Sequence, residues 1–238
     1  MEKDELKIYY EKYLKETKEL SERTVGHYCD ALNKISKLLK DDKKIENSIY
    51  DIESVDELKE LINHVSKNQE YIGLNKRGNN MYSAGLNHFY KFVSGEKFKD
   101  LSARIDILDV PVKKTEKRVM MSKLVDRSNI IRNQVIEASG HQCEYDNSHI
   151  SFIQEKNKLQ YVEAHHIIPL KFQDKFENSL DVYANVISLC PNCHRRIHYG
   201  LNNDVKNMLF KIYDGRITRY KNSGINISIN DIYRLLLK

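Results

Sequence analysis

The chain has 238 residues, of which 40% are hydrophobic and 31% charged, and its formal net charge is +5 at pH 7. This length gives one large or two ordinary domains with real cores, and the composition is typical of a soluble globular protein. The sequence holds no apolar run of membrane-spanning length and no signal peptide at its start, so we expect a cytoplasmic protein. The positive charge permits nucleic acid as a partner without demonstrating it.

The first 95 residues have the pattern of a small helical bundle. Apolar residues recur at helical spacing in 3–20, 25–39, 58–65 and 80–93. Ser21 and Ser54 can cap the second and third helices, while 41–51 is polar and predicts a loop. Gly73 and Gly78 indicate a break before the last helix.

A short part of this bundle resembles a known DNA-binding module. The string Ser21-Glu-Arg-Thr-Val25, followed by Tyr28 and Leu32, is similar to the helical DNA-gripping domain of tyrosine recombinases. The resemblance implies that the bundle recognises or targets DNA. The alternative is that the Tyr and Leu stripes only form a core and the many lysines a solvated face.

A basic connector is predicted from residue 96 to about 126. It contains Pro111 and a run of basic residues, namely Lys113, Lys114, Lys117, Arg118 and Lys123, with Arg127 just beyond. We expect either that this run, led by Lys113 and Lys114, lies along DNA phosphates or that it is a mobile, solvated linker. Ser128 can then cap a helix that ends before Gly140.

The residues that can bind metal or transfer protons are concentrated between Tyr161 and Tyr199. Residues 161–164 and 186–189 predict two short strands, and Pro191 suits the first position of a helix. On that helix His194 and His198 are four residues apart, so their imidazoles lie on one face and can hold one metal ion. Further helices after residue 199 are expected to pack on this domain without contributing chemistry.

This stretch resembles the HNH endonuclease family and its ββα-metal fold. The resemblance rests on Glu-Ala-His165-His166-Ile-Ile-Pro, then Asn185, then Leu-Cys-Pro-Asn-Cys-His194-Arg-Arg-Ile-His198, and it covers about 131–199. Within this family, the stretch resembles in particular the HNH domains of bacterial restriction-type nucleases. We therefore expect a mainly helical α+β protein with a helical domain at 1–95, the connector at 96–126 and an HNH nuclease domain at 127–238.

The resemblance also implies roles for individual residues. His166 matches the general base, and Asn185 matches the residue that orients the base or its loop. Metal ligands are implied at three positions, namely His165, His194 and His198. Glu163 supports the site from the same strand face as His165. Three imidazoles suit Zn²⁺, Ni²⁺, Co²⁺ or Mn²⁺, and Mg²⁺ stays an alternative because phosphate and water can complete its coordination.

A second, structural zinc site is predicted from the cysteines. Cys190 and Cys193 form one zinc knuckle and Cys143 supplies a third thiolate. Where many relatives have another cysteine, this chain offers His149, His141 or Asp146, of which we favour His149. The alternative is a degenerate site whose thiols are merely buried. Cys29 is expected to be a buried, inert thiol.

Double-stranded DNA is the expected partner of this domain, and a homodimer is compatible with the sequence. Arg195 and Arg196 lie off the metal face of their helix and are candidate phosphate contacts, or else solvated helix charge. The leading hypothesis is a metal-dependent DNA endonuclease of restriction or defence type. The alternatives are a zinc-stabilised DNA-binding protein with a vestigial nuclease centre and an HNH toxin.

Overall fold

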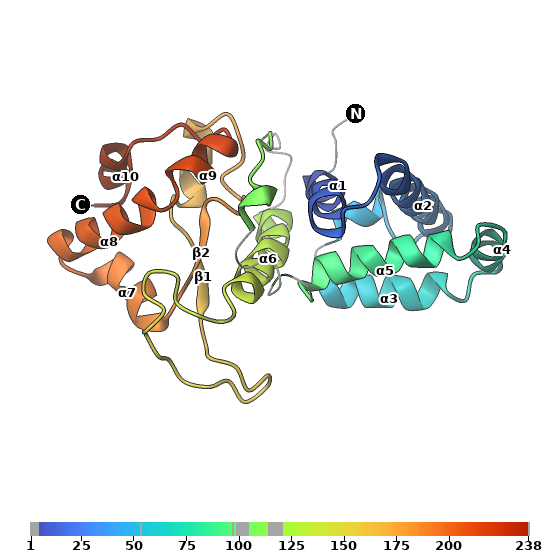
Figure 1. The fold of residues 1–238 in the computed structure, drawn as a ribbon, viewed down its shortest axis with the longest axis horizontal. Helices are drawn as coiled ribbons and strands as arrows, with labels where there is room; N and C mark the ends of the chain where they lie inside the picture. The colour runs from blue at the N-terminus through green and yellow to red at the C-terminus, as the bar shows by residue number, and fades with distance from the viewer. Residues whose placement is uncertain (1–4, 53, 97, 99–104, 114–120, 238) are drawn as a thin grey trace. The chain divides into compact units, whose positions relative to one another are not determined.

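The computed structural model describes residues 5–52, 54–96, 98, 105–113 and 121–237, with only the backbone of 121–128. Two compact units make up the chain: residues 1–97 with 121–130, and residues 98–120 with 131–238. The described part of the chain is mainly helical and contains a small two-stranded sheet, which confirms the predicted fold class (Figure 1). None of its helices combines the length and the apolar character that crossing a membrane requires.

The first unit is a bundle of helices with one short 3-10 turn. Its elements are α1 (Glu5–Lys18), α2 (Glu22–Asp41), η1 (Ile49–Asp51), α3 (Val55–Val65), α4 (Gln69–Arg77) and α5 (Met81–Ser94). The predicted caps are confirmed, since the Ser21 and Ser54 side chains accept hydrogen bonds from the first turns of α2 and α3. Gly73 does not break the chain as expected, because Asn68 caps α4 and this helix continues through the glycine.

Aromatic side chains form the centre of this bundle. The Tyr10 ring packs edge-on against Phe89 at 5.1 Å between centroids and also contacts Phe92. Its hydroxyl donates a hydrogen bond of 3.0 Å to the carbonyl oxygen of Gly85 in α5. The predicted tyrosine stripe of α1 is therefore core.

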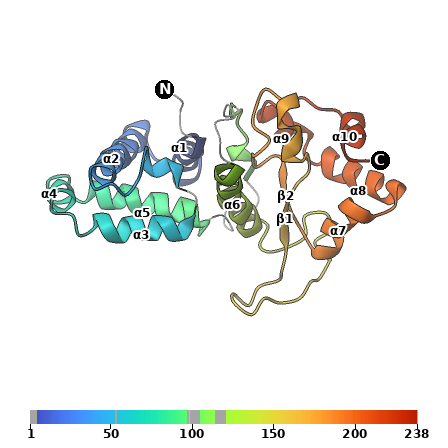
Figure 2. The same cartoon turned by 180° about the vertical axis from the view of Figure 1, so that it is seen from behind.

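The second unit surrounds a two-stranded antiparallel sheet. Its elements are η3 (Ile105–Leu108), the end of α6 (Met121–Ala138), β1 (Glu163–His166), η4 (Leu170–Lys175), β2 (Val186–Leu189), α7 (Pro191–Tyr199), α8 (Asn202–Asp214), α9 (Ile217–Asn222) and α10 (Ile229–Leu236). In both views of the ribbon α7 runs beside the two strands and α8 follows it (Figure 2). The predicted strand at 186–189 and the helix start at Pro191 are confirmed.

The first strand begins two residues later than the sequence indicated. Glu163 pairs with Leu189 and His166 with Val186, so β1 carries both adjacent histidines instead of ending before them. Tyr161 is used elsewhere, because its N–H donates to the carbonyl oxygen of Phe152 at 2.8 Å within the preceding hairpin. The pairing with β2 thus decides where β1 starts.

Two further differences concern the connector. Helix α6 begins at Met121 and not at Ser128, since neither glycine nor proline interrupts 121–128. Residues 105–113 belong to the second unit, where the buried Asp109 accepts two hydrogen bonds from Arg219, of 2.6 and 3.1 Å. Lys114, Lys117 and Arg118 lie outside the described residues.

Candidate functional site

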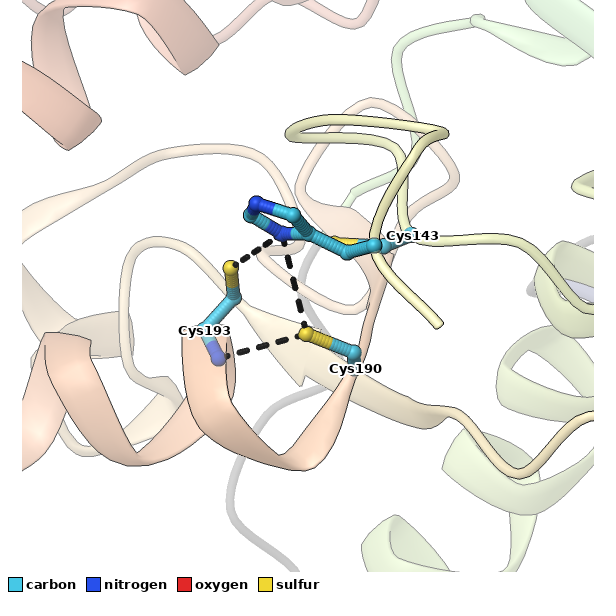
Figure 3. A group of neighbouring side chains, drawn as sticks. Cys143, Cys190 and Cys193 are labelled. Carbon is cyan, nitrogen blue, oxygen red and sulfur yellow. Dashed lines mark hydrogen bonds between the residues drawn. The ribbon is translucent and has the colours of Figure 1, made fainter. Parts of the chain in front are cut away.

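Three cysteines and one histidine gather where the loop after α6 meets the start of α7. Cys143 and His149 lie in the loop, Cys190 caps α7 and Cys193 lies in its first turn. One ligand atom of each lies within 4.8 Å of the others. Nδ1 of His149 is 3.2 Å from Sγ of Cys193 and 3.9 Å from Sγ of Cys190, and Figure 3 shows the labelled cysteines around one point.

This donor set fits a structural zinc ion. All three thiols are buried, and burial raises the pKa of Cys193, which Cys143 and Cys190 raise further by their own charge. Three thiolates would therefore repel one another in a poorly solvated place unless a cation neutralised them. Sulfur and imidazole nitrogen in a group of four are the ligands that structural zinc prefers.

The structure also separates the candidates for the fourth position. His149 offers Nδ1 to the cluster, while its Nε2 faces Oδ2 of Asp146 at 3.7 Å. His141 lies at the end of α6, where its Nε2 is 3.2 Å from Oε1 of Glu137. The geometry therefore places His149 with the thiols, Asp146 behind it and His141 in another environment.

Three imidazoles form a second cluster between β1 and α7. The ring centroids of His165, His194 and His198 are 4.8 to 5.0 Å apart, and their ligand nitrogens lie within 4.8 Å. Nε2 of His165 is buried, with no hydrogen-bond partner among the described residues. An unsatisfied nitrogen in that position is costly, and an ion held by the three rings would satisfy it.

The electrostatics favour the neutral form of two of these imidazoles, those of His165 and His198. Burial, together with the neighbouring His194 and His198, lowers the pKa of His165 to about 3. Burial, His194 and Arg195 also lower the pKa of His198. Neutral imidazoles offer the lone pair that a divalent ion requires.

Glu163 holds one imidazole of this cluster in place. Its Oε2 contacts Nδ1 of His194, and its Oε1 accepts a hydrogen bond of 3.0 Å from the Tyr161 hydroxyl. Burial opposes the charge of Glu163, but the bonds from His194 and Tyr161 outweigh it and hold its pKa below the usual value. With Nδ1 fixed by a carboxylate, the ring of His194 presents Nε2 to the cluster.

His166 follows His165 on β1 but does not join the imidazole cluster. Its Nε2 lies 2.9 Å from Oδ1 of Asp181, and the two side chains are 14% and 7% exposed. Asp181 was not among the residues predicted from the sequence. Its only signal was a carboxylate four residues before Asn185, in the segment between the two strands.

Asn185 joins the two segments that hold this pair. Its side chain is fully buried, and Oδ1 accepts from the N–H of Ile168 at 2.8 Å. Nδ2 donates to the carbonyl oxygens of Ile168 at 2.8 Å and Leu180 at 2.9 Å. Asn185 therefore orients chain segments and does not itself reach the imidazole cluster.

The basic residues that were predicted to contact DNA phosphates, as far as the structure describes them, lie in two different parts of the second unit. Arg195 and Arg196 are exposed on α7, and the Arg195 guanidinium lies 5.9 Å from the ring centroid of Tyr199. Arg195 also acts electrostatically on both Glu163 and His198, which places it at the edge of the imidazole cluster. Lys113 forms an isolated β-bridge with Asn178, and Lys114 lies outside the described residues.

Comparisons with known proteins agree with these two units. Residues 143–200 match the family model of the HNH endonuclease, and residues 8–97 match that of the phage integrase N-terminal SAM-like domain. The chain is 30% identical over 82 residues to the type IV methyl-directed restriction enzyme EcoKMcrA of Escherichia coli K12. That match covers 34% of this chain and only 27% of the relative's length. No solved structure matches the chain.

Proposed function

From the HNH endonuclease domain that this chain carries at residues 143–200, we propose that it is a metal-dependent nuclease of restriction type that hydrolyses double-stranded DNA. The convergence of His165, His194 and His198 carries this proposal. These rings lie next to His166, which faces a carboxylate and not the cluster. Phosphodiester hydrolysis requires a group that holds a metal ion and a separate imidazole that acts as the base, and these residues would supply both.

The residues of the site would divide the reaction between them. His165, His194 and His198 would hold one divalent ion, which when bound would neutralise charge on the scissile phosphate and on the leaving oxygen. His166 takes a proton from the attacking water, whose oxygen bonds to phosphorus. The bond from phosphorus to the 3′ oxygen then breaks, and this oxygen takes a proton from solvent. Three imidazoles favour Zn²⁺, Ni²⁺, Co²⁺ or Mn²⁺, with Mg²⁺ as the alternative.

The cysteine cluster would position this centre from the neighbouring turn. Cys193 and His194 are consecutive residues in the first turns of α7. A zinc ion on Cys143, His149, Cys190 and Cys193 would tie the start of α7 to the loop after α6. The direction of the helix that carries His194 and His198 would then depend on this structural zinc.

We assign DNA recognition to the first unit. Its match to the SAM-like domain of phage integrases at 8–97 supports this role, as does the resemblance of Ser21–Leu32 to a DNA-gripping domain. The name of EcoKMcrA describes a methyl-directed enzyme, so methylated and unmethylated DNA are the substrates to compare. A homodimer and a cytoplasmic location stay predictions from the sequence.

Nicking of supercoiled plasmid by the purified full chain tests the proposal, with Mg²⁺, Mn²⁺, Co²⁺, Ni²⁺ and Zn²⁺ added in turn. His166→Ala should bind DNA and the ion normally but cleave about a hundred- to ten-thousandfold more slowly. His194→Ala should lose activity together with affinity for the added ion. Asn207→Ala is the control, because Asn207 is exposed on α8, in the same unit as the cluster but not part of it.

Two results would contradict the proposal. DNA binding without cleavage under every ion and both methylation states would favour a zinc-stabilised DNA-binding protein. Near-normal cleavage by His166→Ala would show that this imidazole is not the base.

A further inference from the structure

The imidazole that the proposed function assigns as base has a carboxylate partner that neither motif nor family match assigns. We propose that Asp181 is a positioning residue, which holds the Nε2–H of His166 and leaves Nδ1 as the nitrogen that takes the proton from water. The inference rests on the proposed nuclease function. It adds a residue to that site and states which ring nitrogen reacts.

The contact is short and well sheltered. Oδ1 of Asp181 lies 2.9 Å from Nε2 of His166, within the range of a good hydrogen bond. The side chains are 7% and 14% exposed, so water competes little for either partner. A carboxylate only accepts, so the imidazole must carry a proton on Nε2, and in the neutral ring Nδ1 then has the lone pair.

The fold builds this contact from two segments that are far apart in sequence. Asn185 donates to the carbonyl oxygen of Leu180, immediately before Asp181. The same side chain holds both backbone groups of Ile168, two residues after His166. The Leu180 N–H also donates to Oε1 of Gln173 at 2.7 Å. One fully buried amide therefore sets the separation of the base from its carboxylate.

A second carboxylate, that of Glu163, orients an imidazole in the same way as Asp181 orients His166. On β1, successive side chains point to opposite faces, so His165 turns to the imidazole cluster and His166 turns away from it. Glu163 fixes His194, a metal-binding candidate, by its Nδ1. Asp181 fixes His166 by its Nε2, so the two carboxylates orient imidazoles of different function.

The proposed step balances without a further reactant. Water gives one proton to Nδ1 of His166 as its oxygen bonds to phosphorus, the bond to the 3′ oxygen breaks, and this oxygen takes a proton from solvent. Asp181 keeps its hydrogen bond to Nε2–H throughout and offsets the positive charge that the ring gains. The ring later returns the proton to solvent.

The test measures single-turnover cleavage by the full chain with enzyme in excess, in the ion that supports activity. Asp181→Ala should lower the cleavage rate about 10- to 100-fold without changing DNA or ion affinity. Asp181→Asn, which keeps an acceptor oxygen, should recover part of this loss. In the His166→Ala background, Asp181→Ala should cause no further loss, because groups that act as a unit are not additive.

A second measurement does not depend on activity. In protein labelled with ¹⁵N at histidine, the ring signals of His166 should show the Nε2-protonated tautomer, assigned by their loss in His166→Ala. Asp181→Ala should shift these signals toward a mixture of tautomers, and Glu177→Ala, which removes an exposed carboxylate of the same segment, should leave them unchanged.

Three outcomes would overturn the inference. These are wild-type cleavage by Asp181→Ala, an Nδ1-protonated ring in the unaltered chain, or an equal loss from Asp181→Ala in both backgrounds, which indicates a structural role. If the unaltered chain fails to cleave with any ion, the proposed function fails as well. If the unaltered chain cleaves DNA and Asp181→Ala cleaves at the same rate, only the role of Asp181 is refuted and the proposed function stands.

Discussion

Replacing Arg216 by Met should destabilise the second unit more than any surface substitution. This side chain is only 5% exposed although it is positively charged. Arg216 is the N-cap of α9, and its guanidinium donates hydrogen bonds to β2, to the segment just before β2 and to the loop after α6. The acceptors are the carbonyl oxygens of Tyr183 at 3.4 Å, Ala184 at 3.0 Å and Val186 at 3.0 Å, and Oε1 of Glu144 at 2.7 Å.

The expected magnitude follows from what the substitution leaves behind. Removing one partner of a buried ion pair costs about 3–5 kcal/mol. Glu144 keeps 30% of its side chain exposed, so water can solvate its charge and the ion-pair loss falls at the lower end. Each buried carbonyl left without a donor adds about 1–3 kcal/mol, partly offset because methionine fills the space. With the low end of both ranges and only one carbonyl left without a donor, we expect a loss of at least about 4 kcal/mol in the free energy of unfolding.

Urea unfolding followed by circular dichroism measures this loss, since the chain has no tryptophan. The transition of the second unit should move to lower urea with an unchanged slope. Arg234→Met is the matched control, because Arg234 is 78% exposed and bonds only within α10 to Asp231. Equal midpoints for the two variants would refute the inferred role of the buried guanidinium.

Three further predictions concern the metal sites and DNA. Cys190→Ala should lose about one tightly bound zinc per chain and unfold the second unit, whereas Cys29→Ala should keep its zinc; metal analysis of both proteins decides. Glu163→Gln should lower the affinity for the added divalent ion about 10- to 100-fold, as measured by calorimetry. An unchanged affinity would show that this carboxylate does not orient the imidazole of His194. Arg195→Ala should reduce the salt dependence of DNA binding more than Arg196→Ala. An equal salt dependence in the two variants would indicate that both arginines are only solvated charges on the helix surface.

The sequence by itself determined the parts of the site that depend on short-range geometry. Four residues separate His194 and His198, so any helix there places both rings on one face. Pro191 can begin that helix because its missing N–H has no partner in a first turn. Cys190 and Cys193 lie on either side of this start, close enough to share an ion. These features needed only the rise and turn of one helix.

Only the tertiary structure decided which residues from separate segments meet. The register of β1 against β2 placed His165 and His166 within the strand, because their pairing partners are Ile187 and Val186 in β2. Asp181 reached His166 because Asn185 ties two loops together by buried hydrogen bonds. His149 joined the thiols because of the loop's course, although His141 stands closer in sequence to Cys143. Such contacts depend on packing and on satisfying buried polar groups across the whole unit, and residue spacing does not encode them.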